Sequence, residues 1–285
     1  FVETSGKQTL IPRGRAILTP RATGFDKGTY LLDPETITIV GNESSAFTDN
    51  SLVGLWDFES GSDTTAQDQS SNNDGTINGA TPTGSGAPTP QKNTDSLKFD
   101  GSDNVVNVNP YNNQSDILTV SLWAKYQNLP SGNPGLLELR AGGSKNVGLW
   151  VANNSKLWGR VIDGNGGQDF SESPALSQDT WYHITAVFDG SSEAKQYVDG
   201  NLEKTMNYSG DIQNWNELLI GRQGNETWDG QIDDVRIYNQ ALSEKRVKEL
   251  HGSRLTVKGL EELSDDADIN LTASNNIELD LKDDT

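Results

Sequence analysis

The chain has 285 residues, no cysteine and a formal net charge of −19 at pH 7. This acidity argues against binding to nucleic acid or to an anionic membrane surface, and the lack of cysteine excludes disulfides and thiolate metal sites. No stretch approaches the roughly 20 apolar residues of a membrane span, so we expect no membrane insertion. Because the first residue is Phe1, we expect a processed product or a fragment.

Short apolar runs separated by polar turns predict an all-β protein. The 29 glycines, together with many Asn, Asp, Ser and Thr residues, separate these runs. Residues 1–49 contain two strand signals, Gln8–Ile11 and Tyr30–Val40. Two strands are too few to form a domain by themselves.

Residues 50–251 have the character of a large β-sandwich. All seven tryptophans lie in this range, so we expect the aromatic core here. Strand signals recur about every ten residues, with turns such as Asp189-Gly190 between them, as in known sandwiches. The predicted strands are 52–59, 96–100, 104–108, 118–126, 136–140, 147–151, 157–162, 181–189, 194–199 and 218–221.

One predicted strand, Trp181–Phe188, alternates between an apolar face and a mixed face. His183 belongs to the mixed face, where we interpret it as ordinary sheet structure rather than as a catalytic residue. This pattern suits a jelly roll, whose concave outer sheet is often a binding surface. The apolar face consists of Tyr182, Ile184, Ala186 and Phe188.

The stretch Trp228–Ser243 predicts the closing strand of the sandwich. Alternation places Asp233 on the same face as Val235 and Ile237, and it places the adjacent Asp234 on the opposite face. A carboxylate that points towards a core needs a cation or hydrogen-bond donors. We therefore expect Asp233 or Asp234 to have a partner.

The pattern changes twice after this strand. Residues 243–250 predict a short helix, with Ser243 as its N-terminal cap and Val247 and Leu250 on its apolar side. Beyond residue 252 the chain has brief alternating strands without aromatic residues. Their spacing is typical of β-solenoid rungs, which bury their apolar face only against stacked neighbours. These strands are 255–257, 268–272 and 276–281.

Six motifs in this range resemble, in order, those of bacterial laminin-G-like, concanavalin A-like jelly rolls. The resemblance covers residues 50–251 and implies a two-sheet sandwich, often with one calcium ion, that frequently acts as a carbohydrate-binding or adhesive module. The motifs are Leu55-Trp-Asp-Phe-Glu59, Asp68-Gln-Ser-Ser-Asn-Asn-Asp-Gly75, Leu97-Lys-Phe-Asp-Gly101, Trp181-Tyr-His-Ile-Thr-Ala-Val-Phe-Asp-Gly190, Tyr197-Val-Asp-Gly200 and Ile232-Asp-Asp-Val-Arg-Ile-Tyr-Asn-Gln-Ala-Leu242.

The flanking segments resemble two-partner-secretion exoproteins of the filamentous-haemagglutinin class. The matching segments are Phe1–Gly6 with Gly28–Ile39, and Leu263–Ile277, which is similar to a solenoid rung. The resemblance implies a β-helix that a Gram-negative bacterium exports through an outer-membrane secretion pore, so we expect a secreted or cell-surface protein. The predicted organisation is a jelly roll (50–251) between two β-solenoid segments (1–49 and 252–285).

Calcium is the cofactor that this resemblance implies, and Asp-rich turns supply the oxygen ligands that calcium prefers. In the implied jelly roll, the strand before Asp100 and the closing strand can be neighbours, which would bring acidic side chains together. The competing interpretation is that these residues form turns or bind an arginine or backbone donors. Asp68 and Asp74 are better interpreted as Asx-turn residues. The candidate calcium ligands are Asp100, Asp103, Asp233 and Asp234.

Sugar binding needs an aromatic platform beside Asn, Asp or Arg donors, because sugar rings present C–H faces flanked by hydroxyls. The candidate pairs are Trp158 with Arg160, and Trp228 with Asn225. For each tryptophan, a place in the core is the competing interpretation.

The sequence offers little for catalysis. It has two histidines and no cysteine, so a Ser/His/Asp triad or a histidine metal centre is poorly supplied. Adjacent carboxylates on opposite faces, such as Asp233 and Asp234, do not suit glycoside hydrolysis. We therefore expect a non-enzymatic surface adhesin module that binds a glycan or another surface ligand with the help of calcium. The alternatives are a structural spacer without a ligand and, less favoured, a polysaccharide-degrading enzyme.

Overall fold

The computed structural model describes residues 50–252 with short gaps (60, 63, 90–93, 112–114, 129–131, 142–143, 164–165, 191, 209–211 and 213–214), and five strands outside that range. The predicted strand Gln8–Ile11 lies outside the described residues. The structure divides into two compact units. Residues 49–251 form the larger unit, and the five outlying strands belong to the smaller one.

The smaller unit is built from parallel strand pairs. Its strands are β1 (Gly28–Leu32), β2 (Thr36–Val40), β22 (Arg254–Thr256), β23 (Ala267–Leu271) and β24 (Asn276–Asp280). β1 pairs with β23, and β2 pairs with both β22 and β24. Every pair therefore joins a strand that precedes the larger unit to one that follows it.

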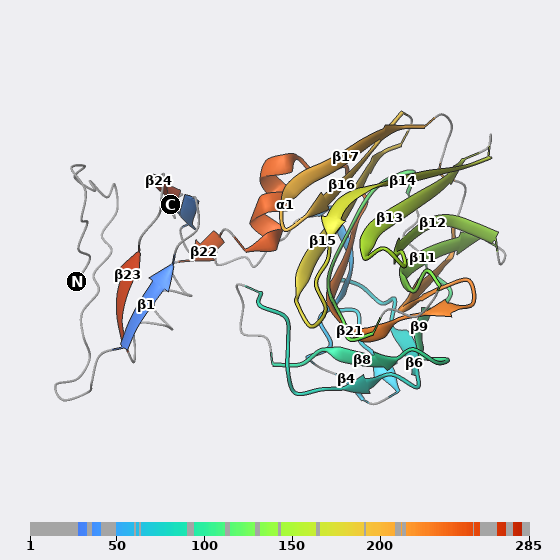
Figure 1. Ribbon diagram of the computed structural model, residues 1–285, viewed down its shortest axis with the longest axis horizontal. Helices are drawn as coiled ribbons and strands as arrows, with labels where there is room; N and C mark the ends of the chain where they lie inside the picture. Colours follow the sequence, from blue (N-terminus) through green and yellow to red (C-terminus); the bar gives the residue numbers. More distant parts are fainter. Residues whose placement is uncertain are drawn as a thin grey trace. The chain divides into compact units, whose positions relative to one another are not determined.

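The larger unit is a sandwich of two antiparallel sheets (Figure 1). In the front sheet the strand order is β14-β13-β12-β11-β18-β9-β6-β5-β4. Its strands are β4 (Gly61–Ser62), β5 (Thr65–Ala66), β6 (Gly75–Asn78), β9 (Val105–Val108), β11 (Gly135–Ala141), β12 (Ser144–Val151), β13 (Lys156–Asp163), β14 (Gly166–Ala175) and β18 (Glu217–Ile220).

In the back sheet the strand order is β17-β16-β15-β10-β21-β8-β7, and β3 pairs with the second half of β21. A small hairpin of β19 (Arg222–Gln223) and β20 (Glu226–Thr227) lies outside both sheets. The back strands are β3 (Leu52–Trp56), β7 (Thr81–Pro82), β8 (Leu97–Asp100), β10 (Ile117–Tyr126), β15 (Tyr182–Asp189), β16 (Glu193–Val198), β17 (Asn201–Asn207) and β21 (Asp229–Tyr238).

The inward faces of both sheets form one apolar core. The predicted alternation of β15 is confirmed, because Ile184, Ala186 and Phe188 are buried in this core and Tyr182 packs against it. Burial of such side chains is the main favourable contribution to folding. The largest fully buried side chains include Trp56, Trp215, Trp228, Tyr111, Phe99 and Phe188.

Gly221 is a point where the two sheets meet closely. Its φ of +81° lies in the left-handed region that favours glycine. A Cβ at this position would lie 2.2 Å from the ring of Phe99 on β8. Glycine is thus required here both by the backbone and by the packing between the sheets.

Helix α1 (Glu244–His251) packs on the outer side of the back sheet, as Figure 1 shows. The predicted cap is confirmed: the Ser243 hydroxyl accepts a hydrogen bond from the backbone N–H of Arg246 (3.3 Å). Val247 and Leu250 are both buried, as predicted. They form a second apolar cluster with Val187, Tyr197, Tyr238 and Leu242. None of the helices in the described residues has the length and apolar character needed to cross a membrane.

Asp233 was predicted to share a face with Val235 and Ile237. This prediction was wrong, because β21 contains a β-bulge. The register with β10 shifts between Ser121 and Trp123, and Asp234 has a φ of +46°. An extra residue in a strand reverses the alternation beyond it. Ile232 and Val235 both face the core, whereas Asp233 lies opposite Trp123 on the outer side of the back sheet.

Candidate ligand-binding surface

Two tryptophans stack on the outer face of the front sheet. Trp150 on β12 and Trp158 on β13 are direct register partners, and their ring centroids lie 6.2 Å apart at an interplanar angle of 22°. Their neighbours Leu149 and Leu157 face the core, so strand alternation turns both indoles outwards. Trp150 is buried beneath its surroundings, while Trp158 is partly exposed.

Arg160 extends this aromatic pair along β13. Its guanidinium carbon lies 6.0 Å from the centroid of the Trp150 ring, within reach of a cation–π interaction. Its Nε donates to Asp169 on the neighbouring strand β14, and its second nitrogen donates to the same carboxylate at 2.7 Å. The hydrogen bonds to Asp169 raise the pKa of Arg160. We call Trp150, Trp158 and Arg160 the tryptophan platform.

The bidentate pair holds Arg160 in one orientation and leaves it able to bind a ligand. A guanidinium has five N–H donors, and two of them are used by Asp169. Both side chains are about one third exposed (37% and 35%), so solvent screens the pair and it contributes little to stability. Its main effect is to fix the position of the remaining donors beside the indoles.

The β19–β20 hairpin packs on the same face of the front sheet. The backbone N–H of Gly224 in its turn donates to the Glu138 carboxylate of β11 at 2.7 Å. Glu138 alternates with the core residues Leu137 and Leu139 and therefore points outwards. Asn225 lies in this exposed turn, so the structure places Trp158, Arg160 and Asn225 on one face.

Of the two interpretations of Trp228, a sugar platform or a place in the core, the structure supports the core. Trp228 is 1% exposed and belongs to the core between the sheets. Its indole N–H donates to the carbonyl oxygen of Gln231 at 3.3 Å, and Tyr126 packs edge-on against its ring. Because its ring is enclosed, Trp228 offers no face to a ligand and is not part of the candidate site.

The predicted neighbours Asp100 and Asp233 lie on adjacent strands but not side by side. β8 and β21 do pair, as expected, yet the register sets Asp100 opposite Asp229. Asp233 lies four residues further along β21, which is about 13 Å at the rise of a strand. Asp103 is exposed in the turn after β8. The structure thus separates Asp100 on β8 from Asp233 and Asp234 on β21.

Asp233 and Asp234 are also committed to partners within the protein. Asp233 accepts hydrogen bonds from the backbone N–H groups of Ala87 (2.8 Å) and Asp234 (2.7 Å). Asp234 forms an ion pair with Arg236 at 2.9 Å. In the described part of the chain, no group of three or more His, Asp or Glu side chains is arranged to hold a metal ion. The four predicted carboxylates therefore do not fit a shared calcium site.

Asp68 organises a turn, in agreement with its interpretation as an Asx-turn residue. Its carboxylate accepts hydrogen bonds from the Ser71 hydroxyl, from the backbone of Leu55 and from Ser70. Burial opposes ionisation of this group, but these donors prevail and lower its pKa. Its charge stabilises the loop that leads into β6.

His183 is a structural residue beneath α1. Its Nε2 lies 2.8 Å from the Ser121 hydroxyl, and both side chains are almost fully buried. Burial, together with the nearby His251 and Arg236, lowers the pKa of His183. Asp199 accepts a hydrogen bond from the backbone N–H of His183 rather than from its ring. The serine cannot reach a substrate, so this arrangement is not a catalytic triad.

A family model supports the fold from the sequence side. Residues 100–248, just over half of the chain, match the model described as the Concanavalin A-like lectin/glucanases superfamily. The chain belongs to this family. A search of curated proteins gave no match. The match spans the tryptophan platform, so the platform is part of the concanavalin A-like domain.

Solved structures show the same concanavalin A-like fold at low sequence identity. The binding domain of Paraclostridial Mosquitocidal Protein 1 is 18% identical, with a TM-score of 0.57 over 71% of this chain and 52% of that one. The chain thus spans about half the length of that relative. Domain 4 of AbnA, a GH43 extracellular arabinanase from Geobacillus stearothermophilus solved with arabinotriose, is 18% identical, with a TM-score of 0.55 over 70% of this chain and 98% of that domain.

A sialidase from Trypanosoma rangeli is also similar to this chain. It is 17% identical, with a TM-score of 0.54 over 72% of this chain and 33% of the sialidase. These similarities include binding domains and enzymes. At such identities they establish the fold alone, because one fold hosts many unrelated functions.

Proposed function

We propose that the concanavalin A-like domain binds a carbohydrate on the outer face of its front sheet and does so without catalysing a reaction. The observation that carries this proposal is the stacked pair of Trp150 and Trp158 beside the fixed Arg160. Trp158 provides the stacking surface, while Arg160 and Asn225 donate hydrogen bonds to hydroxyl groups.

The chemistry of the platform suits a sugar ring. The C–H groups on one side of a pyranose or furanose pack on an indole, and the hydroxyl groups at its edge accept hydrogen bonds from side chains. Trp158 is held by its stacking on Trp150, and Arg160 is held by Asp169. Both groups lose little conformational freedom when a ligand binds, and such preorganisation favours affinity.

A glycan array followed by calorimetry tests this proposal. The array identifies an oligosaccharide that binds, and its affinity is then measured for the wild type and for Trp158→Ala. We expect the substitution to weaken binding at least about tenfold, because it removes the stacking surface. The matched control is Leu202→Ala, which removes an exposed large apolar side chain from β17 of the back sheet.

Three outcomes of this experiment contradict the proposal. An array without any bound glycan favours the alternative that the domain is a structural spacer. Equal affinities of the wild type and Trp158→Ala place the ligand elsewhere. Release of reducing ends from a bound polysaccharide would show that the domain is an enzyme rather than a binding module.

Calcium dependence stays a prediction. The proposed sugar contacts are made directly by Trp158, Arg160 and Asn225. The array is repeated with a chelator, and a loss of binding would show that calcium acts through other residues. Calorimetry with calcium alone then measures its affinity for the wild type and for Asp100→Ala.

We also propose that the domain is an insertion in the β-solenoid stalk of a secreted or cell-surface adhesin of the two-partner-secretion class. The parallel pairing of strands from either side of the sandwich supports this proposal, since parallel strands are how solenoid rungs stack. Export through an outer-membrane pore of a Gram-negative bacterium is part of the same proposal and rests on the sequence resemblance of the flanks.

Paired cysteines test the stacking of the flanking strands. Tyr30 and Ile269 are register partners of β1 and β23, so cysteines at these two positions should form a disulfide, because neighbouring strands bring their Cα atoms within about 6 Å. The control pair Tyr30→Cys and Leu271→Cys is out of register by two residues, which sets the two Cα atoms about 8 Å apart, too far for a disulfide. Equal cross-linking of both pairs would contradict the solenoid register.

A further inference from the structure

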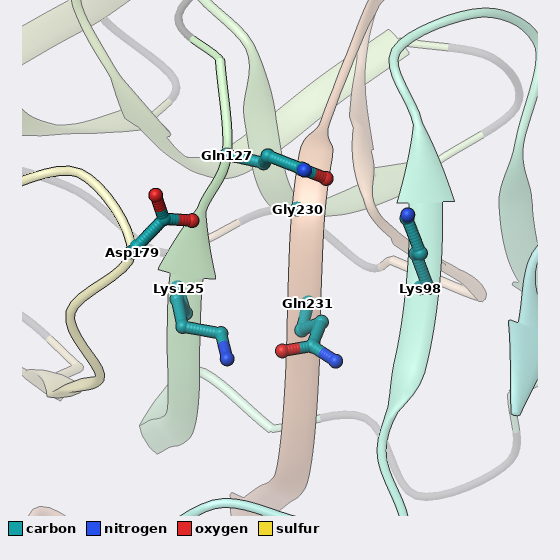
Figure 2. Close-up of a pocket in the computed structure, with 6 residues that line it drawn as sticks. All are labelled: Lys98, Lys125, Gln127, Asp179, Gly230 and Gln231. Carbon is teal, nitrogen blue, oxygen red and sulfur yellow. The ribbon is translucent and has the colours of Figure 1, made fainter. Parts of the chain in front are cut away.

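The back sheet has a pocket of its own on its outer face. Its volume is about 210 Å³, which equals the volume of about seven water molecules. This is enough for one sugar ring but less than the roughly 300 Å³ at which pockets for larger ligands begin. Figure 2 shows the residues that line it: Lys98, Lys125, Gln127, Asp179, Gly230 and Gln231.

Strand register sets three polar side chains in a row across this pocket. Gln231 of β21 lies opposite Lys98 of β8 on one side and opposite Lys125 of β10 on the other. Directly opposed residues of an antiparallel pair point to the same face. Since the flanking residues Leu97, Phe99, Ala124 and Ile232 are buried in the core, the row faces outwards.

The two lysines create a local positive charge on an acidic protein. Neither forms an ion pair with a carboxylate in the described part of the chain, although the net charge of the protein is −19. Their strands are separated by β21, which sets the two backbones about 10 Å apart. Lys125 Nζ lies 4.9 Å from the centroid of the Trp181 ring, and this contact restricts its position. An anionic group between the lysines would meet both charges.

The other lining groups indicate what else the ligand carries. Gln231 Oε1 is buried and has no hydrogen-bond partner in the described residues, so it can accept a hydrogen bond from a hydroxyl group of a ligand. Asp179 brings a carboxylate to the same pocket from the loop before β15, as Figure 2 shows. The lining thus offers two cations and two hydrogen-bond acceptors, so a ligand that carries both an anionic group and hydroxyl groups matches it better than an anion without hydroxyl groups.

We propose that this pocket binds a sugar residue that carries a carboxylate, with Lys98 and Lys125 on the carboxylate and with Gln231 and Asp179 on hydroxyl groups. This site lies on the sheet opposite to the tryptophan platform. It extends the proposed function, because the two faces would then recognise different parts of a ligand or different ligands.

Titration of the full chain with three small probes tests the inference. The probes are methyl glucuronide, which carries both chemistries, methyl glucoside, which lacks the carboxylate, and sodium sulfate, which lacks the hydroxyl groups. We expect the glucuronide to bind at least about tenfold more tightly than either other probe. NMR shifts of the Gln231 side-chain amide report the contact, and the affinity should fall as salt is added.

Substitutions separate this pocket from the rest of the molecule. Lys98→Gln and Lys125→Gln should each weaken glucuronide binding about tenfold, while Lys245→Gln, an exposed lysine of α1, removes the same charge and should leave the affinity unchanged. Thermal unfolding checks that each variant is folded. Trp158→Ala should also leave glucuronide binding unchanged, because it alters only the tryptophan platform. The pocket proposal can therefore hold even if the tryptophan platform binds no glycan.

Several results would overturn the inference. They are the absence of glucuronide binding, equal binding of the glucoside or of sulfate, and unchanged affinity in a variant that lacks both lysines. A loss of glucuronide binding in Trp158→Ala would instead assign the acidic sugar to the tryptophan platform.

Discussion

The two outer faces of the sandwich differ in what covers them. On the back sheet, α1 seals Val187 and Tyr238 under Val247, and His183 is buried beside them. On the front sheet, no helix among the described residues covers the indole of Trp158, which stays partly exposed on Trp150. Aromatic residues under the helix, such as Tyr238, are buried and stabilise the structure. Trp158 on the uncovered face is partly exposed and therefore accessible to a ligand.

Both faces depend on the same core, so the largest effect is expected where the sheets meet. Gly221→Ala places a methyl group against Phe99 at a φ of +81°. We expect the free energy of unfolding to fall by about 3 kcal/mol, from backbone strain and overpacking together. Urea denaturation measures it, and ligand binding on both faces should weaken only as the protein unfolds.

Gly84→Ala is the matched control for this substitution. Gly84 has a φ of +63°, but apart from its two chain neighbours no residue has an atom within 4 Å of the position that the new methyl group would take. This variant should therefore lose only about 1 kcal/mol from the backbone. Equal losses for the two variants would show that the Phe99 ring can move aside without loss of stability. The two sheets would then be packed less tightly at this point than the structure indicates.

The part of the back sheet that α1 covers is tested by Val247→Ala. This substitution leaves a cavity under α1, and we expect the free energy of unfolding to fall by about 2 kcal/mol. Lys245→Ala on the exposed side of the helix should change it by less than about 0.5 kcal/mol. Glycan affinity at the front sheet should be the same in both variants, and a parallel loss of affinity would contradict the separation of the two faces.

The histidine buried under α1 should also make the stability of the protein depend on pH. The pKa of His183 is lowered by burial, so below the unfolded-state value of about 6.5 the unfolded chain binds a proton that the folded protein does not. Stability therefore rises with pH in this range and falls by up to about 1.4 kcal/mol per pH unit below about pH 6.5. Denaturation of the wild type at several pH values measures this slope.

His183→Gln should flatten that slope while keeping a donor near Ser121. The pKa of His251 is lowered as well, by burial, so part of the slope should remain and should disappear only when both histidines are replaced. An unchanged slope in His183→Gln would mean that other groups control the acid sensitivity of the protein.

The smallest effect is expected at the edge of the front sheet, where Asp169 of β14 holds Arg160. Asp169→Asn keeps the shape of the side chain but removes the charge that holds Arg160. Because this pair is exposed, we expect a loss of only about 0.5 kcal/mol in the free energy of glycan binding, roughly twofold in affinity. Arg160→Ala should have a larger effect than Asp169→Asn, and calorimetry with the same oligosaccharide compares them.

Alternation within strands allowed much of the fold to be predicted from the sequence, but not the edges of the sheets. β14 and β17 were missed, and each is the last strand of its sheet. Edge strands have one free side and tolerate polar residues and proline, as in Asn201–Asn207, which is largely exposed, and in β14, which contains Pro174. Their composition therefore resembles that of loops.

The candidate site was predicted in part, for a similar physical reason. Trp158 and Arg160 follow the simple alternation of β13, so their common face could be inferred. Asp233 could not be placed, because the bulge at Asp234 reverses the alternation. The pocket at Lys98 and Lys125 depends on the register of three strands that are distant in the sequence, and no local pattern encodes it.

We propose above all that the uncovered face of the front sheet binds the glycan. The most direct test is an NMR titration that follows the indole N–H signals of the tryptophans, assigned by single substitutions, as the oligosaccharide selected by the array is added. We predict that the signals of Trp150 and Trp158 shift together while that of Trp123, which is buried on the back sheet beneath α1, stays in place. Shifts at Trp123 or Trp181 with Trp158 unchanged would contradict the account.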